Sequence, residues 1–173
     1  MAVAAKSRGY EYIAITEHSK AVKIARGKDE KELLKHFERI DKVNSRLKGL
    51  KILKGVEVDI KSDGSLDLED YFLKQCDVVI AAIHSKFEMP KDQMTQRIIK
   101  ALQNKNVDIF AHPTGRLLKE REPYAVDMEK LLRAAKECGT AMELSAYPDR
   151  LDLNDIYCKL AKDIGVQIAI DTD

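Results

Sequence analysis

Residues 77–87, DVVIAAIHSKF, contain a short apolar run rich in β-branched residues that ends at His84. A run of this length, bounded by polar residues, is typical of a strand buried on both faces of a sheet. The same pattern returns along the chain. Similar runs occupy residues 12–16, 52–58, 107–111, 140–144 and 166–170. We therefore predict a strand at each of these positions.

Longer amphipathic segments separate the runs. The clearest, 29–49, repeats apolar residues at helical spacing, with Asp29 and Glu32 placed as a capping box at its start and Gly49 at its end. Further helices are predicted at residues 1–9, 91–104, 126–138 and 153–164. Strands that alternate with helices predict βαβ units around a parallel sheet, and hence an α/β fold.

Composition narrows the class of protein. The 173 residues suit one domain, expected to cover 1–173, and the net charge of +1 argues against a free-standing nucleic-acid binder, although not against a nucleic-acid substrate held by another domain. The three cysteines lack CxxC spacing and indicate reduced thiols in a cytoplasmic protein. No apolar run reaches the roughly 18 residues that cross a membrane, so no membrane partner is expected.

Residues able to bind metal ions recur in or just after the apolar runs. Three of the four histidines follow such runs, and carboxylates occupy equivalent places in others. The residues are His18, Glu57, Asp59, His84, His112, Glu143, Asp171 and Asp173. Because functional sites of parallel β/α folds form at the carboxyl ends of strands, we expect these side chains to converge there.

A single histidine after a strand is more often an ordinary turn residue than a ligand. Three of them beside carboxylates favour a metal site, because a carboxylate on a doubly buried strand is costly unless it is paired or metal-bound. Mixed imidazole and carboxylate ligands suit zinc, manganese or iron, and their number indicates more than one ion. Glu57, with two oxygens, is the natural bridge. His36, in the middle of a predicted helix, receives no function.

Three basic residues lie close to these positions: Lys86, Arg116 and Arg150. Each is either ordinary surface charge or a contact for a substrate phosphate, which arginine can bind with two hydrogen bonds. Neither a Walker loop nor a GxGxxG or GxSxG motif is present, so the usual nucleotide-binding and serine-hydrolase signatures are missing.

Six stretches together resemble a known family. They are GYEYIAITEHSK (9–20), GVEVDI (55–60) with SDGSLDL (62–68), DVVIAAIHSKF (77–87), VDIFAHPTGRLL (107–118), REPYAVDME (121–129) and PDRLDL (148–153). In order and spacing they are similar to the PHP (polymerase and histidinol phosphatase) domain, especially the version at the C-terminus of bacterial and archaeal family X DNA polymerases. The resemblance covers nearly the whole chain. It implies a distorted seven-stranded β/α barrel with a site for up to three metal ions, manganese or zinc, with iron as an alternative.

The resemblance also implies roles for individual residues. Glu57 would bridge two ions, and His84 would bind one of that pair. His18 and His112 would hold the third ion, and Asp173 would bind the first. Glu57, His84 and Arg116 would serve catalysis, with Lys86, Arg116 and Arg150 as substrate contacts. No role carries over to Asp171, since the family often has serine there.

The chain departs from the family pattern at several points. It contains no His-x-His, and it stops after DTD (171–173), where the family continues with a histidine. We therefore expect a partial domain that lacks the first strand and the final turn, has weak or no activity alone, and can form homo-oligomers through open sheet edges. Glu17 replaces the usual aspartate, and Ser145 and Tyr147 stand where asparagine is common.

The function implied is metal-dependent phosphoester hydrolysis. The polymerase likeness implies a DNA 3′ end as substrate, with 3′–5′ exonuclease and 3′-phosphatase activity in DNA repair and a polymerase domain in the parent chain. Two alternatives stay open: a small-molecule phosphatase acting on phosphomonoesters such as histidinol phosphate, and an inactive scaffold.

Overall fold

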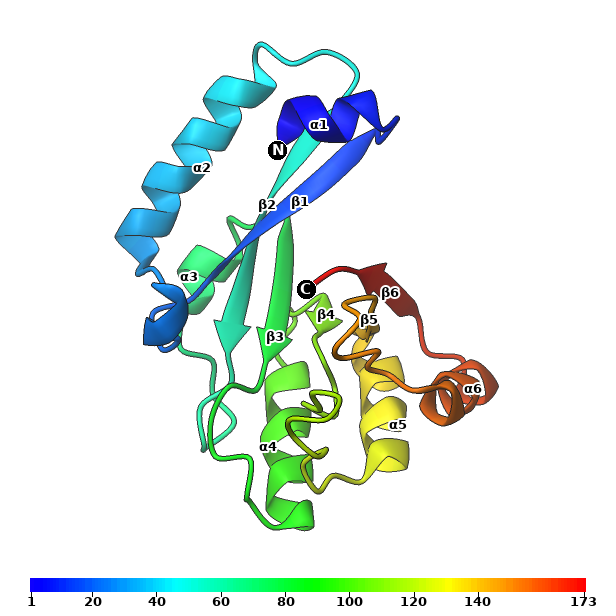
Figure 1. The fold of residues 1–173 in the computed structure, drawn as a ribbon. Helices are drawn as coiled ribbons and strands as arrows, with labels where there is room; N and C mark the ends of the chain where they lie inside the picture. Colours follow the sequence, from blue (N-terminus) through cyan, green and yellow to red (C-terminus); the bar gives the residue numbers. More distant parts are fainter.

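The computed structural model describes residues 1–173, and a single parallel sheet lies at its centre (Figure 1). The six strands follow one another in the sheet in chain order, and every neighbouring pair is parallel. Their bounds are β1 Tyr12–His18, β2 Lys51–Asp59, β3 Val78–Ala82, β4 Ile109–Phe110, β5 Ala141–Ser145 and β6 Ile168–Asp171. Each predicted strand is present, which confirms the α/β class.

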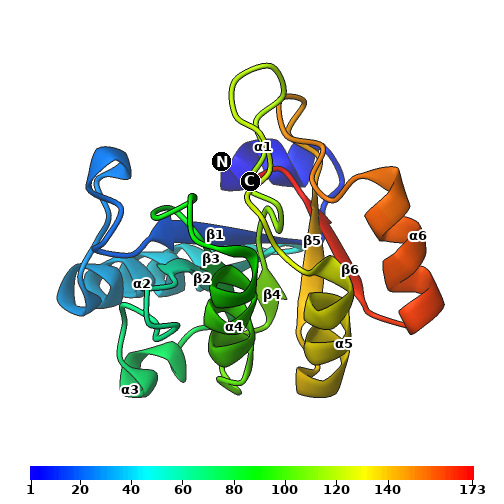
Figure 2. The same ribbon diagram turned by 90° about the horizontal axis from the view of Figure 1, so that it is seen from below.

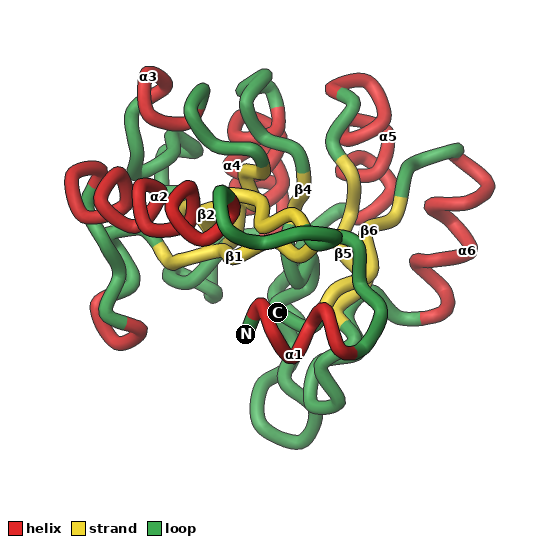
Figure 3. Tube along the Cα trace, turned by 90° about the horizontal axis from the view of Figure 1, so that it is seen from above, coloured by secondary structure: helices red, strands yellow, loops and turns green.

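One helix precedes β1, and helical segments link each pair of consecutive strands. They are α1 Ala2–Ser7, α2 Glu30–Asn44, α3 Asp70–Leu73, α4 Lys91–Leu102, α5 Met128–Cys138 and α6 Asp155–Ile164, with a 3-10 turn, η1, at Lys23–Ala25. Helices α2, α4, α5 and α6 cover the outer side of the sheet, whereas α1 lies on the other side, near both termini (Figures 2 and 3). The predictions missed α3 and η1, which are too short for a periodic pattern.

The sheet curls into an open half-barrel rather than a closed one. In the sheet β1 pairs only with β2, and β6 pairs only with β5. A hollow of about 800 Å³ runs along the inner face, lined by apolar side chains of the strands and by His18, Glu57 and Asp173. The predicted barrel is therefore found only in part: the sheet is curved as in a barrel, but it has six strands rather than the seven expected.

The hydrophobic core lies between the outer face of the sheet and the helices that cover it. Leu33 and Phe37 of α2 are buried, and Phe37 stacks on Phe72 with ring centroids 5.6 Å apart. Both hydrogen bonds of the predicted capping box at Asp29 are present. Helix α2 ends at Asn44 rather than near Gly49, because the Asn44 side chain forms two hydrogen bonds to the backbone of Ile52 in β2 and so ties the helix end to the sheet.

Two expectations from composition can be compared with the structure. All three cysteines are free thiols. None of the helices combines the length and the apolar character needed to span a lipid bilayer.

Candidate metal centre

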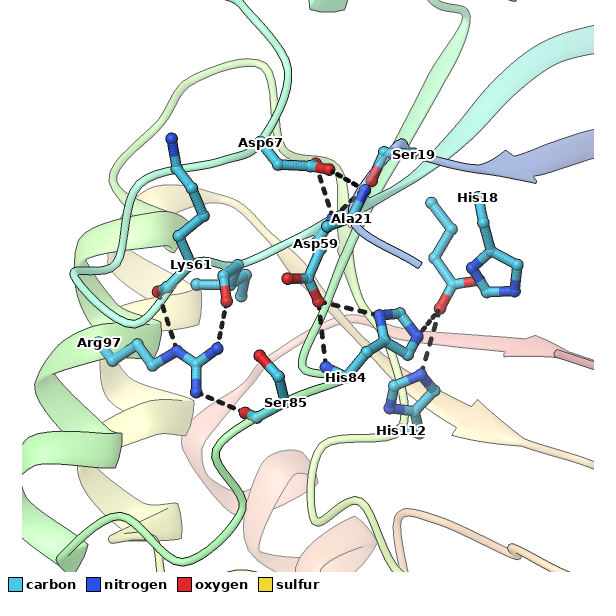
Figure 4. Close-up of polar contacts among 12 residues, drawn as sticks. His18, Ser19, Ala21, Asp59, Lys61, Asp67, His84, Ser85, Arg97 and His112 are labelled. Atoms are coloured by element: carbon cyan, nitrogen blue, oxygen red, sulfur yellow. Dashed lines mark hydrogen bonds and ion pairs between the residues drawn. The ribbon is translucent and has the colours of Figure 1, made fainter. Parts of the chain in front are cut away.

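The parallel register brings three histidines to one edge of the sheet (Figure 4). His18 is the last residue of β1 and pairs in register with Glu57 on β2. His84 and His112 each lie two residues beyond the end of their strands, β3 and β4. Side chains that are far apart in the sequence therefore meet where the strands end.

Glu57 lies at the centre of this group. Its Oε1 atom is 3.1 Å from His84 Nε2 and 3.2 Å from His112 Nε2, and its Oε2 atom is 3.2 Å from His18 Nδ1. The Glu57 side chain is only 9% exposed. One buried carboxylate thus contacts three imidazoles with both of its oxygens, an arrangement that suits a ligand shared between cations.

The potential ligand atoms fall into two overlapping groups. His18, Glu57 and His84 form one, and Glu57, His112 and Asp173 form the other, with ligand atoms within 4.8 Å of one another in each. Both groups contain Glu57. The family resemblance placed His18 and His112 on a common ion, whereas this structure associates His18 with His84 and His112 with Asp173. The assignment of each residue to an ion stays a prediction.

The charges of Glu57 and His84 are coupled. Burial raises the pKa of Glu57, but hydrogen bonds from His112 and His84 outweigh this effect and hold the pKa well below its usual range. Burial lowers the pKa of His84, but hydrogen bonds to Asp59 and Glu57 outweigh this and raise it to about 9. At neutral pH the metal-free pair is therefore ionised, and a metal ion that binds His84 must displace its proton.

Asp59 orients His84. Its Oδ1 atom accepts hydrogen bonds from the backbone N–H and from the ring Nδ1 of His84, both at 3.1 Å (Figure 4). This leaves Nε2 directed at Glu57. The backbone N–H of Asp59 donates to Ser19 Oγ and Asp67 Oδ1. Carboxylates that fix a ligand histidine in this way are common around protein metal ions. The sequence analysis grouped Asp59 with the residues able to bind metal ions but did not predict that it orients His84.

A buried arginine ties two ligand-bearing segments together. Arg97 of α4 is 3% exposed and donates to the carbonyl oxygens of Lys61 and Ser85 at 2.9 Å and to that of Ile60. These carbonyls lie just after the ends of β2 and β3, next to Asp59 and His84. Sequence reasoning missed Arg97, although a charged residue on the apolar stripe of a helix was a usable signal.

The loop that carries His112 is held by carboxylates from β5 and from the segment after it. Glu143 accepts a hydrogen bond from the backbone N–H of His112. Asp152 accepts from the backbone N–H groups of Thr114 at 2.8 Å and Gly115 at 3.0 Å. Burial and the neighbouring Asp171 carboxylate raise the pKa of Glu143 to about 10, so Glu143 is protonated at neutral pH. These contacts show that Glu143 and Asp152 support the loop.

The predicted phosphate-binding residues occupy different settings. Arg116 donates from Nε to the carbonyl of Arg150 at 2.8 Å and from its terminal nitrogen to the carbonyl of Leu151. Arg150 forms an ion pair with Asp173, which is one of the predicted metal ligands. Lys86 is exposed and has a left-handed backbone, with φ of +60°. Arg150 therefore contacts one predicted ligand, whereas neither Arg116 nor Lys86 forms a hydrogen bond or ion pair with one, and the phosphate contacts of all three stay predictions.

His36, to which no function was assigned, lies outside the cluster. Its Nε2 atom is 3.7 Å from Oε1 of Glu17, whose other oxygen binds Lys28. This small group is an ion-pair network between β1 and α2.

Comparisons with known proteins show which named proteins this chain is similar to. No family model matches it. It is 44% identical, over all 173 residues, to part of the DNA polymerase/3′-5′ exonuclease PolX of Bacillus subtilis strain 168, and spans 30% of that protein. It is 34% identical over 179 aligned positions to a probable phosphatase of Thermoanaerobacter sp. strain X514, covering 98% of this chain and 68% of that protein.

A solved structure shares this architecture. The crystal structure of histidinol phosphate phosphatase from Lactococcus lactis, complexed with zinc, L-histidinol and phosphate, aligns with a TM-score of 0.62. The alignment covers 99% of this chain and 77% of the other, at 17% sequence identity. At that identity the likeness establishes the architecture alone.

Proposed function

Because this chain belongs to the PHP (polymerase and histidinol phosphatase) family, we propose that it forms a metal-dependent phosphoesterase centre on His18, Glu57, His84 and His112. The observation that carries the proposal is the contact of one buried carboxylate with three imidazoles. A donor set of this kind suits zinc or manganese better than magnesium or calcium. The solved neighbour, which contains zinc, supports the same choice.

The residues of the chain have separate tasks in this proposal. Divalent ions held by these residues would supply Lewis-acid polarisation of the phosphoryl group and a water of lowered pKa. Glu57 bridges the two ligand groups, and Asp59 keeps the Nε2 atom of His84 directed toward Glu57. Arg116, whose guanidinium is held by backbone carbonyls, lies on the loop that carries His112 and balances the negative charge that develops on the phosphate.

The substrate we propose is the 3′ end of DNA, from which the centre removes either a 3′-phosphate or a terminal nucleotide. The support is the identity of 44% to a protein named as both polymerase and 3′-5′ exonuclease. The chain spans less than a third of that protein, so a polymerase domain in the same polypeptide is part of the proposal. A small phosphomonoester is the second candidate, since the probable phosphatase is 34% identical over nearly the whole chain.

A turnover assay tests the function. The chain, at micromolar concentration with excess Mn²⁺ or Zn²⁺, is incubated for hours with a 3′-phosphorylated oligonucleotide, the same oligonucleotide ending in a 3′-hydroxyl, and histidinol phosphate. Long incubation is needed because we expect slow turnover from this ligand set. We expect metal-dependent phosphate release from the first substrate. A chelator and the Glu57→Gln substitution should each abolish this activity.

The control variant is Asp63→Ala, since Asp63 lies in an exposed turn outside the cluster. It should keep full activity. Equal product from wild type and Glu57→Gln would refute the phosphoesterase proposal. Faster hydrolysis of histidinol phosphate than of the oligonucleotide would favour the second candidate.

A further inference from the structure

A hollow of about 730 Å³ shares no lining residue with the metal centre, but its walls continue from segments that carry His84 and His112. Its walls come from the segment after β3, at Lys86 to Met89, and from the segment before α5, at Arg121 to Tyr124. The volume is in the range of small-molecule sites, about 300–1,000 Å³.

The walls of this hollow are attached to two metal-binding segments. Lys86 is two residues from His84, a reach of at most about 7 Å along the chain. The hydroxyl of Tyr124 donates to the carbonyl of Pro113 at 2.8 Å, next to His112. A phosphate bound at the centre therefore has this hollow as a neighbour, and the group esterified to that phosphate can extend into it.

The hollow contains a flat platform built on Arg121, and its charged lining is mixed, with Lys86 and Arg121 on one hand and Glu88 and Glu122 on the other. The guanidinium carbon of Arg121 lies 4.2 Å from the ring centroid of Phe87, and Phe87 in turn stacks on Tyr124 at 6.2 Å with an interplanar angle of 20°. The Nε atom of Arg121 donates to the carbonyl of Gly115 at 2.7 Å, which fixes the plane of the guanidinium. Neither Arg121 nor Lys86 forms an ion pair with a carboxylate.

We propose that this hollow binds the nucleobase adjacent to the phosphate being hydrolysed, with the base stacked on the guanidinium of Arg121. Single-stranded nucleic acids are held by this combination of aromatic rings, arginine planes and cations. The guanidinium is already oriented by Phe87 and Gly115, so binding orders few additional groups. Lys86, at the rim, is placed to contact the next phosphate. The inference rests on the proposed function, because the base is located by the phosphate at the metal centre.

Binding of modified oligonucleotides tests the proposal. Two short 3′-phosphorylated oligonucleotides are compared, one ending in 2-aminopurine and one ending in an abasic residue, each mixed rapidly with the Mn²⁺-loaded chain. We expect the chain to prefer the first by roughly 5- to 100-fold, the range that one stacked base provides, and to quench its fluorescence. Arg121→Lys keeps the positive charge but removes the planar guanidinium, and Phe87→Leu keeps an apolar side chain but removes the aromatic ring. Both variants should therefore lose the preference for the 2-aminopurine oligonucleotide.

The matched control is Arg133→Ala, because Arg133 is an exposed arginine paired with Glu129 on the outer helix α5. It should keep the preference, and circular dichroism shows whether each variant is folded. Equal affinity of the wild type for the two oligonucleotides overturns the inference, as does an unchanged preference in folded Arg121→Lys and Phe87→Leu. An Arg121-dependent preference found together with equal phosphate release by the wild type and Glu57→Gln would keep the base site and refute the phosphoesterase proposal instead.

Discussion

Removal of the Asp59 carboxylate should weaken metal binding although Asp59 itself need not touch a metal ion. In Asp59→Ala, the backbone N–H and the ring Nδ1 of His84 lose the oxygen that both contact at 3.1 Å. His84 is then free to rotate, and its Nε2 atom is no longer held toward Glu57. The variant therefore separates the orientation of a ligand from the presence of that ligand.

The size of the effect follows from the burial of the site. Asp59 is 4% exposed, so water replaces the lost contacts poorly. Each buried donor left unpaired costs about 1–3 kcal/mol, which gives about 2–6 kcal/mol for the two donors of His84. Loss of a carboxylate that orients a ligand histidine lowers metal affinity about 10- to 100-fold. Asp59→Asn keeps an oxygen acceptor and should recover most of both losses.

Two measurements on the same samples decide the result. Urea unfolding of the metal-free chain gives the loss of stability, and calorimetric titration with Zn²⁺ gives the change in affinity. Asp63→Ala, in the exposed turn, serves as the control and should match the wild type. A folded Asp59→Ala variant that binds Zn²⁺ with wild-type affinity would show that His84 does not depend on Asp59, and the reasoning would be wrong.

Four further predictions concern other parts of the molecule. The metal-free chain should lose about 3 kcal/mol of stability as the pH rises from 6.5 through about 9. The reason is that protonated His84 stabilises the fold, fully at a pH below the His84 pKa of the unfolded chain and no longer above its raised pKa in the folded chain. Urea unfolding measured across this pH range checks the prediction, and a flat profile contradicts it. Arg116→Ala should leave the metal content unchanged and weaken phosphate binding, and a loss of metal in elemental analysis would give Arg116 a structural role instead. Gly115→Ala should destabilise the chain more than Gly139→Ala, since both glycines have positive φ but only at position 115 would the added carbon lie 2.6 Å from Tyr124; equal melting temperatures would contradict this. The chain should associate in sedimentation experiments, because β1 and β6 present unpaired edges, and a monodisperse monomer with a cooperative melt above about 60 °C would disagree.

Much of the architecture could be predicted because local patterns and tertiary structure agree. Each apolar run forms a strand, and the glycines at positions 139 and 165 end helices α5 and α6 in left-handed conformation. The bounds differ where a tertiary contact overrides the local pattern. Helix α2 stops early because Asn44 binds β2, and β4 is reduced to Ile109–Phe110.

The ligands were easier to predict than the residues that support them. Histidines that follow parallel strands must meet at one edge of the sheet, so position in the sequence was sufficient to group His18, His84 and His112. The role of Asp59 depends on which way the His84 ring turns, and that of Arg97 on three carbonyls from two other segments. No local pattern encodes such contacts. The ion pair between Arg150 and Asp173 was missed for the same reason.

The location of bound ions tests the central claim most directly. Crystals of the chain soaked separately in Zn²⁺ and Mn²⁺, with anomalous diffraction measured at each metal's absorption edge, show the ions independently of any activity. We predict ions about 2.0–2.2 Å from imidazole nitrogens of His18, His84 or His112, with at least two of them about 3.5–4 Å apart and sharing the carboxylate of Glu57. Anomalous peaks absent from this cluster at saturating metal, or present only at surface carboxylates elsewhere, would contradict the account.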